Sequence, residues 1–297
     1  MKLEQKRNFE ALLGDTFGFV RETGAHFFPT LLRVNCIYFL AMAVFIYFAF
    51  STLGADGADF MPRPGRLNWN GWGAFSRELV WGFGLSWWKI AAMGVSVLFL
   101  AVGALVFLAY TPAYMILYRR EGHAPDFHTI VRFIRSRFGR LVIYFLGTIL
   151  MSIPIAAVCI PLFALLILSV VGIALIPVLL FVAMLLFSLL LYAYLDDERP
   201  GFFDAISIAW ERLKIAFWPN VFSNGIVYLA SGVFSLLPAI VNSIFHAIEA
   251  PQLVFLGIMC ALISLVLHLV ISSLYSINVG MIYFSSRAAV RENSLRF

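Results

Sequence analysis

The run LVIYFLGTILMSIPIAAVCIPLFALLILSVVGIALIPVLLFVAMLLFSLLLYAYL, residues 141–195, contains no Asp, Glu, Lys, Arg or His. As a single helix it would be roughly 80 Å long, because each helical residue adds about 1.5 Å. A hydrocarbon core is only about 30 Å thick. The run therefore predicts two membrane crossings, with a turn near residues 169–172.

The rest of the chain has the same character. Of its 297 residues, 62% are hydrophobic and only 12% are charged, whereas an ordinary soluble domain carries about 25% charged residues. We expect one all-α integral membrane domain, residues 1–297, formed as a polytopic bundle of about six transmembrane helices. The expected spans are residues 30–53, 88–116, 141–167, 173–195, 217–240 and 253–285.

The basic residues predict an orientation. Segments 1–33, 117–140, 196–216 and the tail from Arg287 hold 5, 6, 3 and 3 Lys or Arg, and all other segments hold four. The positive-inside rule then places both termini in the cytoplasm and loop 52–87 outside. That loop is rich in tryptophan, so it either rests on the outer membrane interface or binds a protein partner.

Three amphipathic stretches precede long apolar runs, and each ends near a similar phrase: FFPT at 27–30, RFGR at 137–140 and FWPN at 217–220. We interpret them as interfacial helices, each followed by a bend and a crossing hairpin. This predicts three parallel repeats, approximately 1–120, 121–198 and 199–297. The basic residues expected to contact anionic lipid headgroups are Arg132, Arg135, Arg137, Arg140, Arg212 and Lys214.

Two of these stretches resemble a known family. LDDERPGFFDAISIAWERLKIAFWPN (195–220) and NFEALLGDTFGFVRETGAHFFPTLL (8–32) resemble the membrane domain of the glycerophosphoryl diester phosphodiesterase type and its uncharacterised bacterial relatives. The resemblance implies a multi-pass protein of the bacterial cytoplasmic (inner) membrane. It implies no phosphodiesterase activity, because that chemistry belongs to a separate barrel of about 250 residues, for which this chain has no room.

Two groups of polar residues are candidates for a site. The cluster Asp196, Asp197 and Glu198 is interpreted as a solvated span end, with a divalent cation site as the alternative. The last two spans each carry a polar face, which predicts either interhelical hydrogen bonds or a lined cavity. The residues of these faces are Asn224, Tyr228, Ser231, Ser235, Ser264, His268, Ser272 and Tyr275.

No signature of catalysis is found, and we expect no catalytic residue, no cofactor, no metal and no nucleic-acid partner. The expected partners are membrane lipids, with anionic headgroups on the cytoplasmic side. The favoured function is a non-enzymatic scaffold or accessory subunit for envelope or lipid-related machinery. The alternative is a transporter or channel for a small polar solute or lipid that uses the polar faces, and an enzyme is the third possibility.

The orientation is testable with single cysteines in a background in which the three native cysteines are alanine. An impermeant thiol reagent added to intact cells should label Asn68→Cys but not Ser136→Cys, because loop 52–87 is predicted to be outside. Equal labelling of the two variants would overturn the orientation.

Overall fold

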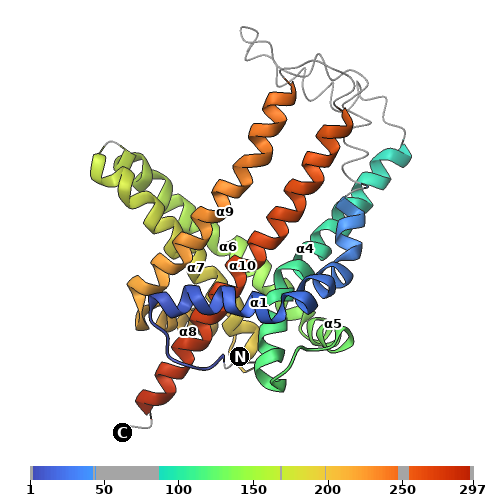
Figure 1. Cartoon of the computed structure of the whole chain (residues 1–297). Coiled ribbons are helices and arrows are strands. Elements are labelled where there is room, and N and C mark those ends of the chain that lie inside the picture. Colours follow the sequence, from blue (N-terminus) through green and yellow to red (C-terminus); the bar gives the residue numbers. More distant parts are fainter. Residues whose placement is uncertain are drawn as a thin grey trace. The chain divides into compact units, whose positions relative to one another are not determined.

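The computed structural model describes residues 3–42, 44, 87–167, 169–197, 199–246 and 254–294, and these residues form helices joined by short turns. They divide into two compact units, residues 1–31 with 108–297 and residues 32–107. The labelled helices (Figure 1) are α1 (Phe9–Val34), α4 (Trp87–Glu121), α5 (Phe127–Ser136), α6 (Phe138–Ile167), α7 (Val170–Asp196), α8 (Phe202–Ile215), α9 (Phe217–His246) and α10 (Val254–Ser294).

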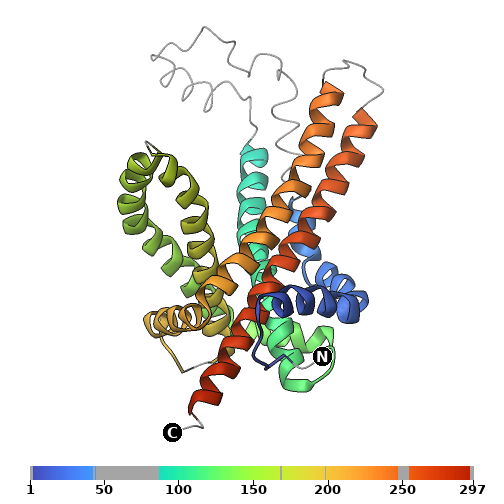
Figure 2. The same ribbon diagram turned by 60° about the vertical axis from the view of Figure 1, so that its left-hand side comes forward.

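The long uncharged run forms two helices, as predicted. α6 and α7 pack against each other as a hairpin (Figure 2), and the chain reverses at Ser169. The Ser169 side chain accepts a hydrogen bond from the N–H of Gly172 at 3.0 Å, which caps the first turn of α7. A polar cap thus marks the break between the two helices of this uncharged 55-residue run.

α9 and α10 run side by side, and α7 packs against both of them (Figures 1 and 2). α10 has 41 residues, so it is about 60 Å long and exceeds a hydrocarbon core of about 30 Å. Within its section Leu269–Glu292, 72% of the most apolar 18-residue window is buried in the protein. This section of α10 is the centre around which α1, α7, α8 and α9 gather.

The second and third amphipathic stretches form short helices. α5 is capped by Asp126, whose side chain accepts from the N–H of His128 at 3.2 Å. α8 begins after Gly201, whose N–H donates to the Asp204 carboxylate at 3.1 Å. Each short helix ends two residues before an aromatic residue, Phe138 or Phe217, at which the next long helix begins. The sequence therefore located both breaks.

The prediction that the chain bends at residues 27–30 is wrong. α1 continues through Pro29 and ends only at Val34, where the chain turns by 56° into a short helix, Cys36–Met42. Tertiary contacts stabilise the helix just before the proline, since Phe27 packs edge to face on Tyr110, and the Tyr110 hydroxyl donates to the Phe27 carbonyl at 2.7 Å. A proline therefore does not end this helix, although it is disfavoured in a helix interior.

Within the described residues, four helices are long and apolar enough to cross a membrane, or five if the bent pair at Asn35 counts as one span. The four sections are Gly94–Glu121, Phe138–Ile167, Leu175–Asp196 and Leu269–Glu292. This composition and length agree with a membrane protein. Six spans and three repeats stay predictions, and residues 45–53 of the first expected span lie outside the described part.

The close approach of α10 to its neighbours gives a test of the packing. A methyl group at Gly280 would lie 2.7 Å from the Tyr192 hydroxyl and would also overlap the Met115 sulfur. We expect Gly280→Ala to destabilise the protein by about 1–3 kcal/mol, as overpacking usually does, and to lower the temperature at which purified protein aggregates in detergent.

Gly232→Ala in α9 is the matched control, because no atom lies within 4 Å of the added methyl group. It should be neutral or slightly stabilising, since alanine is the better helix former. If Gly280→Ala tolerates heat as well as Gly232→Ala, the described packing of α10 is incorrect.

Candidate functional site

One carboxylate is buried where the apolar section of α7 ends. Asp196 is the last residue of α7, and its side chain is only 1% exposed. An isolated carboxylate in such a place would cost several kcal/mol, so it needs charged and hydrogen-bonding partners.

Asp196 finds these partners on two other helices, α4 and α10. Arg119, near the end of α4, donates to both carboxylate oxygens at 3.0 and 2.8 Å, which is the bidentate geometry that guanidinium groups favour. From α10, Arg287 forms an ion pair with Asp196, and the Tyr283 hydroxyl donates to it at 3.1 Å. Arg120 donates to the Asp196 backbone carbonyl at 2.9 Å. We call these residues the Asp196 cluster.

The N-terminal segment completes the Asp196 cluster with a second acid. The Glu4 carboxylate lies 3.3 Å from a nitrogen of Arg119 and 3.4 Å from a nitrogen of Arg287. Arg212 of α8 lies over the Tyr283 ring, 5.9 Å from its centre. Burial lowers the pKa of the Arg212 guanidinium, and the nearby Arg287 charge lowers it further. The cations therefore outnumber the acids around Asp196.

The interpretation of residues 196–198 as a solvated span end is wrong for Asp196. Asp196 is buried and paired, Asp197 is exposed, and Glu198 lies outside the described residues. The groups that face the Asp196 carboxylate are arginines and a tyrosine. Their positive charge makes the position unsuited to a divalent cation.

Of the described members of the predicted polar faces, Asn224 is buried, Ser272 and Tyr275 are half-buried, and Tyr228 is exposed. Asn224 of α9 is fully buried. The Tyr275 hydroxyl of α10 lies 3.2 Å from that of Ser188 on α7, and its ring contacts the Tyr228 ring. Ser272 donates to the Leu269 carbonyl of its own helix at 3.1 Å. The side chains of Ser231, Ser235, Ser264 and His268 lie outside the described part of the structure.

A buried polar contact that the sequence analysis missed joins α1, α9 and α10. The amide nitrogen of Asn278 donates to Thr16 at 3.1 Å and to Ser223 at 2.9 Å. All three residues are fully buried. A sequence signal exists, because Thr16, Thr23 and Thr30 are seven apart, on one face of a helix, and each of them is buried.

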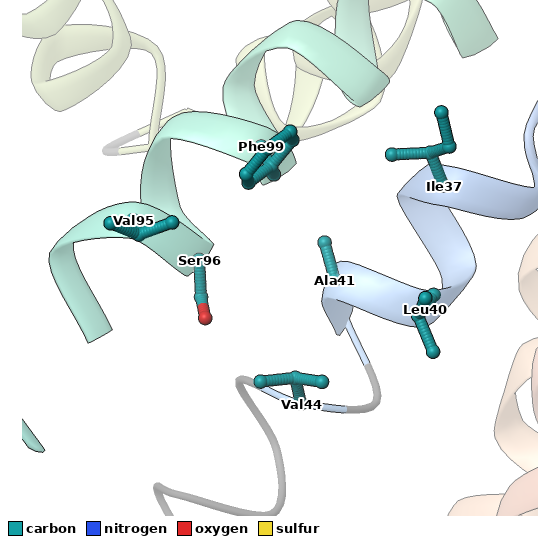
Figure 3. Close-up of a pocket in the computed structure, with 7 residues that line it drawn as sticks. All are labelled: Ile37, Leu40, Ala41, Val44, Val95, Ser96 and Phe99. Atoms are coloured by element: carbon teal, nitrogen blue, oxygen red, sulfur yellow. The ribbon is translucent and has the colours of Figure 1, made fainter. Parts of the chain in front are cut away.

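The unit of residues 32–107 contains an apolar cavity of about 250 Å³ (Figure 3). Its lining side chains come from the short helix Cys36–Met42 with Val44, and from the first half of α4. Ser96 is the one polar residue among them. Such a surface suits methyl groups or an acyl chain and offers little to a polar solute.

The six predicted lipid contacts fall into two groups. Arg132, Arg135 and Lys214 are exposed. Arg137 stacks on Phe133 at 4.0 Å and is buried, whereas Arg140 stacks on Tyr194 and donates to the carbonyls of Tyr194, Asp197 and Pro200. Arg212 belongs to the surroundings of the Asp196 cluster. Contact of any of the six with lipid stays a prediction.

The chain was compared with protein-family models, with curated proteins and with solved structures, and none of the three comparisons found a match. The resemblance to the phosphodiesterase-type membrane domain is therefore a prediction that depends on residues 8–32 and 195–220 alone. The Trp-rich loop, for which a protein partner was considered, lies outside the described residues apart from Trp87.

The Asp196 cluster gives a stability test. Asp196→Asn keeps the shape but removes the counter-charge of Arg119 and of the half-exposed Arg287, so it should destabilise the protein by about 1–3 kcal/mol. Thermal unfolding of the detergent-purified protein is the measurement. Asp197→Asn, one residue further along and exposed, should change stability by no more than about 0.5 kcal/mol.

A double variant separates charge from packing. Removing one cation with Arg119→Gln should make Asp196→Asn less harmful than the sum of the two single changes, since fewer charges are left uncompensated. If Asp196→Asn is as stable as Asp197→Asn, the carboxylate does not hold the helix ends together.

Proposed function

We propose that this protein is a multi-pass protein of the bacterial inner membrane with both termini in the cytoplasm. It acts as a non-enzymatic scaffold or accessory subunit for envelope or lipid-related machinery. The observation that carries the proposal is a set of hydrogen bonds that polar side chains of the long helices form inside the bundle. These hydrogen bonds join neighbouring helices and so hold the bundle together.

Three contacts support this role. Asn278 joins α10 to α1 and α9, the Tyr192 hydroxyl of α7 donates to the Ser276 carbonyl of α10 at 2.8 Å, and Tyr275 meets Ser188. A solute pathway needs polar groups that face open space, whereas these groups face each other. Hydrogen bonds of this kind between membrane helices are worth about 0.6 kcal/mol each, and they fix the relative rotation of the helices.

The exposed apolar and aromatic surfaces of α6 and α8 support a role that depends on neighbouring molecules in the membrane. In the most apolar 18-residue window of α6 no residue is buried within the protein, and Leu150 of α6 is 70% exposed. On α8, Phe203 and Trp210 are exposed, while Ala205 and Ala209 on another face are buried. An aromatic outer face of this kind suits a helix that lies in the membrane interface.

The alternative is a transporter or channel for a small polar solute or lipid. It is supported by the polar residues on α9 and α10, because a path lined by Asn224 and Ser272 would lie between these helices. The two hypotheses differ in whether water reaches those positions.

Cysteine accessibility tests this difference in the background without native cysteines. Under the scaffold hypothesis, Asn224→Cys and Ser272→Cys should resist a water-soluble thiol reagent in folded protein, because packing excludes water. Glu211→Cys, at an exposed charged position of α8, is the positive control. Rapid reaction at Asn224→Cys and Ser272→Cys would favour the transporter.

Photo-crosslinking in native membranes tests the scaffold role directly. A crosslinking residue in place of Leu150 should give one defined protein adduct, and one in place of the buried Leu189 of α7 should not. Adducts with lipid alone at Leu150 would contradict a scaffold that contacts its partner through α6.

A further inference from the structure

A small cavity lies beside the first turns of α9, in the larger unit. The N-terminal segment contributes Lys6 and Arg7, α9 contributes Asn220, and α10 contributes Ser285 and Ser286, with apolar residues between them. Its volume is about 50 Å³. Since one water needs roughly 10–15 Å³ by this measure, the cavity holds about three to five waters, which is close to the bulk of one phosphate group.

Two of the lining groups are hydrogen-bond donors without an acceptor in the described structure. Asn220 is only 3% exposed, and its side-chain nitrogen is buried with no hydrogen-bond partner there. The Ser285 oxygen accepts from the Arg7 backbone N–H at 2.9 Å, which leaves its own proton to be donated. A buried donor without a partner costs about 1–3 kcal/mol, so these groups favour a guest that accepts hydrogen bonds.

The charge of the lining points to an anion. Lys6 is exposed and forms no ion pair with a described residue, whereas the Arg7 guanidinium is paired with Asp15 at 2.7 Å. No carboxylate lines the cavity. The amino end of α9 adds the positive end of a helix dipole, which also favours an anion.

The position of the cavity relates it to a membrane surface. Trp218, two residues before Asn220, is 57% exposed and stacks on Phe222, which is 52% exposed. Tryptophan side chains on membrane proteins gather at the level of the lipid headgroups. An exposed aromatic pair on the same helix end as the cavity therefore favours a position near the lipid phosphates.

We propose that Lys6, Asn220 and Ser285 form a binding site for a phosphate group at the amino end of α9. Lys6 supplies the charge, and the Asn220 amide and the Ser285 hydroxyl donate to the phosphate oxygens. The phosphate belongs either to an anionic lipid headgroup or to a soluble phosphate compound. The site is independent of the scaffold role proposed above.

The test uses the full-length protein in a maltoside detergent, which contains no phosphate. Dioctanoyl phosphatidylglycerol is titrated, and the adducts are counted by native mass spectrometry. We expect one saturable adduct, which Lys6→Gln weakens about tenfold because a charge-assisted hydrogen bond is lost. Asn220→Asp keeps the shape but adds a repelling charge, so it should weaken binding further.

Lys214→Gln is the matched control, because it removes the same charge from an exposed position outside the cavity. It should change binding by less than about twofold, as expected for one screened surface charge. Lys6 is exposed, so Lys6→Gln tests the charge without disturbing packing, whatever Asn220→Asp does to the fold.

Two further probes identify the source of the phosphate. If inorganic phosphate displaces the lipid at comparable concentration, the natural guest is a soluble phosphate compound, and if only the lipid binds, it is a headgroup. Both results support the site. It is overturned if dioctanoylglycerol binds as well as the phospholipid, if Lys6→Gln binds as wild type, if Lys214→Gln weakens binding as much as Lys6→Gln, or if neither phosphate probe binds.

Discussion

The buried carboxylate of Asp196 constrains the larger unit more than any other single group in the described structure. Its partners, Arg119 and Arg287, are 77 and 91 residues away along the chain. A carboxylate shielded from water is stable only when the neighbouring helices are placed so that their cations reach it, because an unpaired buried charge costs several kcal/mol. The ends of α4, α7 and α10, with the N-terminal segment through Glu4, are therefore held in one arrangement.

Away from Asp196, the contacts between the helices change from ion pairs to aromatic packing and neutral hydrogen bonds. Next to Asp196, the rings of Tyr192 and Tyr283 pack against one another in the interior. About one turn further along α10, Asn278 contacts Thr16 and Ser223. In the most apolar 18-residue window of α6 no residue is buried, whereas in that of α10 72% of the residues are buried. One end of the unit is specified by polar contacts, and most of α6 leaves its apolar side chains exposed to the surroundings.

The sequence was informative where structure depends on neighbours along the chain. Uncharged length predicted the α6–α7 hairpin, and the amphipathic stretches predicted α5, α8 and the breaks before Phe138 and Phe217. Sequence reasoning failed at Pro29 and Asp196, because their outcomes depend on distant partners. Tyr110 stabilises the helix around Phe27, and arginines from other helices reach Asp196. A single sequence carries no signal for such pairs.

The positive charges of the larger unit also divide into two kinds, those held by distant partners within the protein and those that are exposed. Arg7, Arg119, Arg140 and Arg287 are held by acids, backbone carbonyls or aromatic rings of the protein itself, so their charges serve the fold. Exposed cations such as Arg132 attract any anionic surface, but salt screens that attraction within about 10 Å and it selects no particular group. Selection requires donors that are fixed, desolvated and unsatisfied. In the described structure the Asn220 amide beside Lys6 combines these properties, whereas the exposed side chains of Arg132, Arg135 and Lys214 do not.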